Sequence, residues 1–174
     1  MTEEPYLSRS FLTMLVATFT FLVVSLTVVA NNTYLTATIY EANQTLRQIQ
    51  AQRETATAGK IFLNNLLVSL PLIVPAVGLF PFIIAWINTG QTIGLLSLAT
   101  GMPPAQYVLS IVTLAFPEIL AYTVIMSENL LLTYKILTKT GATERLKTQT
   151  LKSIIIYVVL LILGAVTEAF MIAG

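Results

Sequence analysis

Residues 11–30 read FLTMLVATFTFLVVSLTVVA, an apolar run without a charged side chain. A helix needs about 20 such residues to cross a bilayer, so this stretch predicts a membrane span. The rest of the chain agrees, because 56% of its 174 residues are hydrophobic and only 10% are charged, with a mean hydropathy of +0.82. A soluble domain carries about 25% charged residues. The sequence therefore predicts an integral membrane protein whose first partner is the lipid bilayer.

Four further apolar segments follow the first, and the five together predict a polytopic, all-α membrane protein forming a single domain over residues 1–174. The expected spans are 11–30, 61–78, 81–98, 106–137 and 151–172. Prolines and glycines divide them. Gly78 and Pro81 mark a turn between the second and third spans, and Pro71 and Pro75 are expected to kink the second. Pro117 leaves two alternatives for the fourth, a long tilted helix or an interrupted one.

Basic side chains lie unevenly on the two sides of a five-span chain. Six fall on one side and three on the other: Arg9, Lys135, Lys139, Arg145, Lys147 and Lys152, against Arg47, Arg53 and Lys60. Because basic residues concentrate on the cytoplasmic side, we expect a cytoplasmic N-terminus and an outside C-terminus. Asn31 and Asn43 begin N-glycosylation sequons on the expected outer side.

A polar segment at about 36–58 separates the first two spans. Ile39, Ala42, Leu46 and Ile49 recur there at the spacing of one helix face, which predicts an extracytoplasmic amphipathic helix, separate from the first span or continuous with it. Two interpretations stand. The helix covers the protein's own outer surface or the lipid headgroups, or it mediates self-association or docking of other membrane proteins.

Three glutamates stand within apolar runs, and such residues are by default candidates for function. Glu118 lies near the middle of the fourth expected span, Glu128 nearer the inner side, and Glu168 close to the outer end of the last. A charge at the bilayer centre costs at least about 2.5–3.5 kcal/mol, so Glu118 is the most demanding of the three.

Neutral polar side chains on neighbouring spans are the expected partners of Glu118, namely Asn64, Asn65, Asn88, Gln91 and Tyr122. One interpretation is a buried hydrogen-bond network that holds helices together. The other is an ion or proton site, because a proline directly before a buried carboxyl is one way to open a membrane cavity.

Small residues predict close helix packing. Gly90 and Gly94 form a GxxxG motif in the third span, and Ala165 and Ala169 form a similar pair in the fifth. We expect contacts within the chain more often than contacts between chains.

The composition also argues against several classes of function. The chain has no Cys and no His, which removes thiol and imidazole chemistry and the usual zinc ligands. Its net charge of +1 gives nucleic acid no electrostatic attraction, and no phosphate-binding loop predicts a nucleotide. We therefore expect a protein that is not an enzyme and needs no cofactor or metal.

Several short elements resemble the stage II sporulation protein M family of membrane proteins. They are the run Ile61-Phe62-Leu63-Asn64-Asn65-Leu66-Leu67, then Gly78, then Asn88-Thr89-Gly90 followed by Gly94, and then Glu118-Ile119-Leu120-Ala121. The positions that match are Phe62, Asn64 or Asn65, Gly78, Asn88, Gly94, Glu118 and Ala121, over about residues 58–172. The chain departs from the family in having no Pro-His-Gly element before Glu118.

This resemblance implies a non-enzymatic scaffold or assembly component, since the sporulation members hold a wall-remodelling complex in the membrane. Partners would meet the outer amphipathic helix or the basic inner loop at 138–150. The alternative is a small transporter or channel subunit with an ion or proton site around Glu118.

Overall fold

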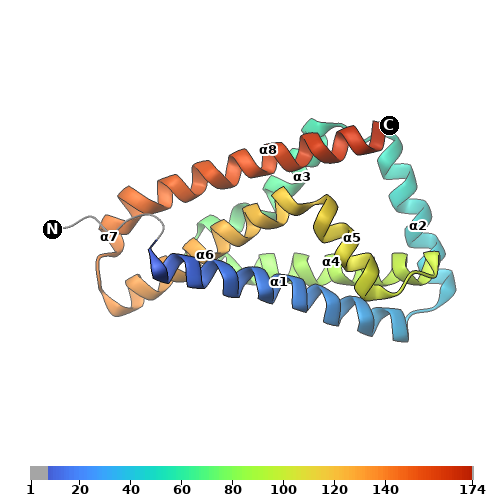
Figure 1. Ribbon diagram of the computed structural model, residues 1–174, viewed down its shortest axis with the longest axis horizontal. Helices are drawn as coiled ribbons and strands as arrows, with labels where there is room; N and C mark the ends of the chain where they lie inside the picture. Colours follow the sequence, from blue (N-terminus) through green and yellow to red (C-terminus); the bar gives the residue numbers. More distant parts are fainter. Residues whose placement is uncertain (1–7, 174) are drawn as a thin grey trace.

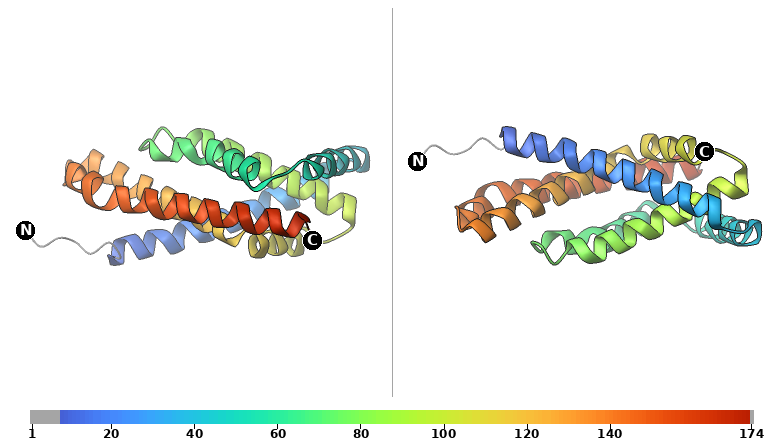
Figure 2. Two further views of the ribbon diagram at one scale, coloured as in Figure 1. Left: turned by 90° about the horizontal axis from the view of Figure 1, so that it is seen from above. Right: turned by 90° about the horizontal axis from the view of Figure 1, so that it is seen from below.

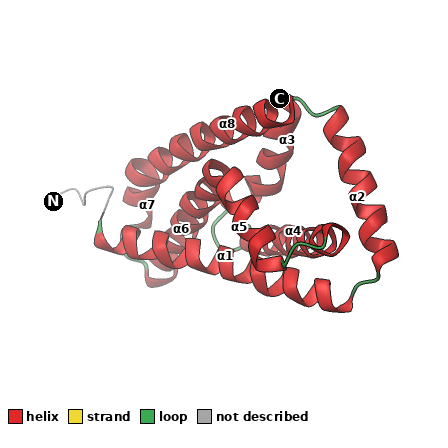
Figure 3. Cartoon of the chain, turned by 45° about the vertical axis from the view of Figure 1, so that its right-hand side comes forward, coloured by secondary structure: helices red, strands yellow, loops and turns green. Residues whose placement is uncertain are grey.

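The computed structural model describes residues 8–173, which form helices joined by short turns and contain no β-strand (Figure 3). This confirms the expected all-α class. The elements in chain order are α1 (Arg9–Thr36), α2 (Ile39–Glu54), α3 (Ala58–Ser69), the 3₁₀ turn η1 (Leu70–Ile73), α4 (Leu79–Thr100), α5 (Pro104–Leu114), α6 (Phe116–Thr138), α7 (Ala142–Arg145), the π-helical turn η2 (Leu146–Thr150) and α8 (Leu151–Ala173).

Within residues 8–173, three helices are long and apolar enough to cross a membrane: α1, α4 and the continuous run from α7 through α8. The pair α5 and α6 makes a fourth candidate, bent by 84°. The segment expected as the second span, 61–78, is instead a shorter apolar helix over Ala58–Ile73. The helical membrane architecture is therefore confirmed, whereas the count of five spans stays a prediction.

The long helices run side by side, and α2 lies across one end of them (Figures 1 and 2). α1 packs against α4 and α6, and α8 packs against α6 and α3. We call the end that carries α2 and the end of α8 the α2 end, and the opposite end, where α1 begins, the α7 end (Figure 1). α2 packs on α4, so part of the predicted amphipathic face covers the protein itself.

α2 is separate from α1 because a capping box begins it at Thr38. The Thr38 hydroxyl accepts a hydrogen bond from the backbone N–H of Glu41, and the Glu41 carboxylate accepts one from the backbone N–H of Thr38. The helix ends at Glu54 and α3 already begins at Ala58. The outer segment is therefore shorter at both ends than the expected 36–58.

The turn between α3 and α4 lies earlier than expected. α3 ends at Ser69, directly before η1 and Pro71, and the turn occupies 74–78. Pro71 and Pro75 thus end the helix rather than kink it, since a proline has no backbone N–H to continue the helical hydrogen bonds. Pro81, expected to mark the turn, lies in the first turn of α4, where proline is tolerated.

Polar ties hold this turn against α6. Asn129 Nδ2 donates hydrogen bonds of 2.7 Å to the carbonyl oxygens of Leu72 and Val74, and Asn129 Oδ1 accepts one of 3.2 Å from the N–H of Ala76. Gly78 closes the turn, because a Cβ atom there would lie 1.7 Å from the Pro71 carbonyl oxygen. The short hairpin of α3 and α4 is therefore fixed at a defined depth along α6.

Candidate functional site

A cleft of about 1110 Å³ opens at the α2 end, between α2, α3, α4, α5, α6 and α8. Its polar lining brings together residues that lie far apart in the sequence: Arg53, Asn64, Asn65, Asn88, Glu118 and Glu168. Five of these six, all but Arg53, are candidate site residues predicted from the sequence. We call this space the Glu118 cleft.

The break between α5 and α6 positions Glu118. The chain leaves α5 after Leu114 and turns at Ala115, and Pro117 and Glu118 form the first turn of α6. This resolves the alternatives for the fourth expected span in favour of an interrupted helix. Gly164 of α8 lets the two helices approach closely, because a Cβ atom there would lie 3.2 Å from Glu118 Cβ. α8 then brings Glu168, one turn further on, into the same cleft.

Two neighbours interact with the Glu118 carboxyl. The Tyr122 hydroxyl donates a hydrogen bond of 2.5 Å to Glu118 Oε1 across one turn of α6. The Asn65 side chain of α3 is near enough to interact with the carboxyl electrostatically. The structure shows no salt bridge to Glu118 from the described residues, and the nearest charged group that acts on this carboxyl is another carboxyl of the cleft, that of Glu168.

Asn65 has an unusual position. Its side chain is only 8% exposed, and Oδ1 accepts a 3.4 Å hydrogen bond from Asn64 Nδ2. Its own Nδ2 is buried and has no hydrogen-bond partner among the described residues. A buried donor without an acceptor costs about 1–3 kcal/mol. No described residue lies within hydrogen-bonding geometry of this amide nitrogen, and the Glu118 carboxyl interacts with it at longer range.

α2 supplies charges near the cleft opening. Arg53 and Glu54 are exposed residues of its last turn and both line the cleft. Arg53 acts electrostatically on Glu168, yet the two form no salt bridge. The lining thus carries one cation and three carboxyl groups, a local excess of acid.

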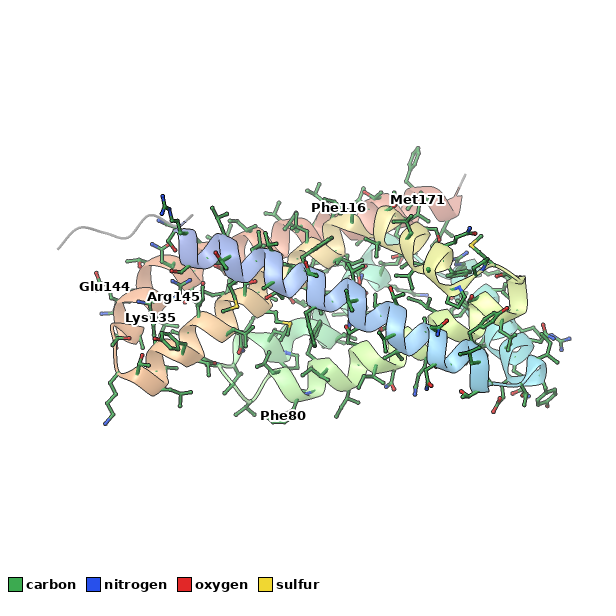
Figure 4. All side chains as sticks on the ribbon, turned by 60° about the horizontal axis from the view of Figure 1, so that its bottom comes forward. Phe80, Phe116, Lys135, Glu144, Arg145 and Met171 are labelled. Atoms are coloured by element: carbon green, nitrogen blue, oxygen red, sulfur yellow. The ribbon has the colours of Figure 1, made fainter. Side chains whose placement is uncertain are left out.

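A second polar cluster lies at the α7 end and is closed. Arg145 forms a bidentate pair with Glu128, with Nε 2.9 Å from Oε1 and an NH₂ nitrogen 2.6 Å from Oε2. Thr150 donates to the same carboxylate at 2.8 Å, and Ser153 lies within hydrogen-bonding distance at 3.4 Å. Arg145 and Glu128 are 7% and 1% exposed. Figure 4 shows Arg145 beside Glu144 and Lys135 at this end.

Two of the predicted site residues lie outside the Glu118 cleft. Glu128 belongs to the closed cluster rather than to the Glu118 cleft, and Gln91 is exposed on α4 outside the cleft lining. The sequence analysis expected neutral partners for Glu118 alone and named no partner for Glu128. The pairing of Glu128 with Arg145 was not predicted, because it needs the fold of 139–150 to bring the two together.

The small residues pack helices together within the chain. Cβ atoms at Gly90 and Gly94 would lie 2.8 Å from Val29 and 2.5 Å from the Ala30 carbonyl oxygen, both on α1. Ala121 is fully buried on α6. The sequon asparagines Asn31 and Asn43 are exposed but lie within α1 and α2, and their glycosylation stays a prediction.

Metal binding finds no support in the geometry. Across residues 8–173 no group of three or more acidic, histidine or cysteine side chains is arranged to hold a metal ion. The chemistry of the Glu118 cleft is therefore that of carboxyl, amide, phenol and guanidinium groups.

Comparison with known proteins gives one family. The model of the family described as Stage II sporulation protein M matches residues 10–171, nearly the whole chain. No curated protein and no solved structure matches.

Proposed function

The chain belongs to the stage II sporulation protein M family, and from this membership and the Glu118 cleft we propose that it is a small transporter or channel subunit. The observation that carries the proposal is the position of Glu118. It lies at a helix break inside apolar segments, lines a cleft of about 1110 Å³, and forms no salt bridge with a basic side chain of residues 8–173. Broken helices with polar side chains at the break form the binding sites of many transporters.

The acid excess sets the sign of the solute. With three carboxyl groups and one guanidinium in the lining, the cleft attracts cations rather than anions. Glu118 is the deepest candidate ligand. We propose further that the protein is multi-pass with a cytoplasmic N-terminus, which places the α2 end and the cleft opening outside, and that it acts without a catalytic step.

Flux through proteoliposomes tests this function. We expect cation-dependent currents on a solid-supported membrane after challenge with sodium, potassium, protons or small alkylammonium ions. Glu118→Gln should abolish the current, whereas Glu144→Gln, the same chemical change at an exposed carboxyl of the α7 end, should leave it intact. Equal currents from both variants, or the absence of current from folded wild-type protein with every cation, would contradict transport.

The second candidate function is that of a membrane scaffold, which the family resemblance implies. The observation that favours it is the exposed face of α2, where Ile39 and Tyr40 are 58% and 69% exposed although α2 packs on α4. We expect a scaffold to recover a partner at fixed stoichiometry after cross-linking through this face. Replacing Ile39 and Tyr40 with serine should then remove the partner, while Glu118→Gln should leave it bound.

A further inference from the structure

We propose that the Glu118 cleft binds an organic ammonium compound that carries a hydrogen-bond acceptor close to its nitrogen, with Glu118 receiving the ammonium and Asn65 donating to the acceptor. This inference names the solute of the site and so rests on the proposed function. It starts from two polar groups in the cleft lining: a carboxyl without a cationic partner and an amide N–H without an acceptor among the described residues.

The first group is the Glu118 carboxyl, which lacks a cationic partner among the described residues. Tyr122 supplies one donor to Oε1, and no described basic side chain forms a salt bridge with it. By contrast, the Glu128 carboxylate on the same helix accepts hydrogen bonds from two Arg145 nitrogens and from the Thr150 hydroxyl. Since a carboxylate in an apolar region is costly without a cation or several donors, Glu118 is the carboxyl left for a cation from outside the chain.

The second group is the side-chain N–H donor of Asn65, which lacks an acceptor among the described residues. This donor is buried, has no hydrogen-bond partner among the described residues, and belongs to a side chain that lines the cleft and interacts with Glu118. An inorganic cation would leave this N–H group unmet, because it has no lone pair to offer. A compound with an oxygen acceptor beside its ammonium group supplies a cation to Glu118 and an acceptor to Asn65.

The size and charge of the cleft agree with an organic compound. Its volume of about 1110 Å³ is slightly above the roughly 300–1,000 Å³ of sites for small organic ligands, which leaves room for such a compound, and the carboxyl groups of the described residues are not clustered for a metal. Glu168 and Glu54 add negative charge around Glu118. Arg53 lies on the exposed last turn of α2, so it borders the opening and does not neutralise Glu118.

Binding to purified protein in detergent tests the inference with three compounds of matched size: 2-aminoethanol, propylamine and ethylene glycol. The first has both groups, the second lacks the acceptor and the third lacks the ammonium. We expect 2-aminoethanol to bind tightest and ethylene glycol not to bind. Glu118→Gln should weaken 2-aminoethanol by at least about tenfold, the loss expected for a charged hydrogen bond, while Glu144→Gln should not.

Asn65→Leu separates the two parts of the proposal. It should lower the preference for 2-aminoethanol over propylamine by about threefold or more, because one neutral hydrogen bond is lost, and leave propylamine binding nearly unchanged. Thermal unfolding of Glu118→Gln and Asn65→Leu, compared with wild type and Glu144→Gln, shows that any loss of binding occurs in folded protein. An unchanged preference in Asn65→Leu, or tighter binding of ethylene glycol than of the amines, would overturn the proposal.

The ammonium group can come from a free solute or from a lipid headgroup. Binding of 2-aminoethanol in nanodiscs of phosphatidylglycerol, whose headgroup has no ammonium, and of phosphatidylglycerol mixed with phosphatidylethanolamine distinguishes them. Weaker binding in the mixture identifies a headgroup ligand, and equal binding identifies a free solute; both support an ammonium site.

The binding and flux measurements fail independently. Binding of 2-aminoethanol without flux would refute transport and keep the site, whereas flux of inorganic cations without amine binding would keep transport and refute this inference.

Discussion

The Tyr122 hydroxyl donates a hydrogen bond of 2.5 Å to the Glu118 carboxyl across one turn of α6. It joins two residues of one helix at the point where Glu118, in the first turn of α6, lines the cleft. Farther along α6, Glu128 is enclosed by Arg145, Thr150 and Ser153. One helix thus carries a carboxyl enclosed by polar partners, Glu128, and another that lines the open cleft, Glu118.

The closed pair at the α7 end should be important for stability. Arg145→Ala leaves Glu128 buried and unpaired, and removing one partner of such a pair costs about 3–5 kcal/mol. We expect a large loss of thermal stability in detergent. The double variant Glu128→Leu/Arg145→Met removes both charges and should be more stable than Arg145→Ala. Equal melting temperatures for wild type and Arg145→Ala would refute a structural role for the pair.

Close packing of α4 on α1 predicts intolerance to any side chain at Gly94. A Cβ atom there would lie 2.5 Å from the Ala30 carbonyl oxygen, so Gly94→Ala should destabilise the protein by about 1–3 kcal/mol despite the better helix propensity of alanine. Gly59→Ala is the matched control, since nothing lies within 4 Å of its Cβ position. Thermal unfolding should separate the two variants, and equal stability would contradict this packing.

The turn at 74–78 should depend on Asn129. Asn129→Ala removes the donor to Leu72 and Val74 and the acceptor for Ala76, so hydrogen exchange in this turn should accelerate.

Ala76 itself has φ +61°, a conformation that costs a residue with a side chain about 1–2 kcal/mol. Ala76→Gly should therefore stabilise the protein, and a lower melting temperature would contradict this assignment of strain.

The start of α2 should respond to acid. Backbone and side-chain hydrogen bonds from Thr38 hold the pKa of Glu41 below its ordinary value of 4.5. A lowered pKa stabilises the folded helix above the unfolded-state pKa, and that contribution is lost as the pH falls through the folded-state value. The protection factors of the amides at 39–42, which are corrected for the pH dependence of intrinsic exchange, should therefore fall at acid pH. In Glu41→Gln these protection factors should stay constant over this range, and an equal acid response in that variant would exclude Glu41 as the cause.

Much of the architecture follows from local sequence signals. Long apolar runs predicted the helices, and Pro117 allowed for the break that brings Glu118 to the cleft. Boundaries were harder to predict: Thr38 and Glu41 have the spacing of a capping box, which would have placed the start of α2 correctly. Pro71 ended a helix where a kink was expected, because neighbouring α6 offers Asn129 to the freed backbone groups.

Most residues of the candidate site were predicted from the sequence, but their separation into an open cleft and a closed cluster was not. Asn64, Asn65, Asn88, Glu118 and Glu168 share one cleft because α3, α4, α6 and α8 converge at the α2 end. Arg53 and Arg145 could not be assigned from the sequence. Arg145 contacts Glu128, and Arg53 acts electrostatically on Glu168, only because the connecting segments fold. No residue spacing indicates either interaction.

Labelling of a single cysteine tests the central claim that Glu118 lies in a cleft open to water. The chain contains no cysteine, so Asn88→Cys places one thiol in the cleft lining, and Ala165→Cys places one at a position only 1% exposed. We predict that a membrane-impermeant maleimide added outside cells labels Asn88→Cys rapidly, that 2-aminoethanol slows this labelling, and that Ala165→Cys stays unlabelled. Labelling of Asn88→Cys no faster than that of Ala165→Cys would contradict the account.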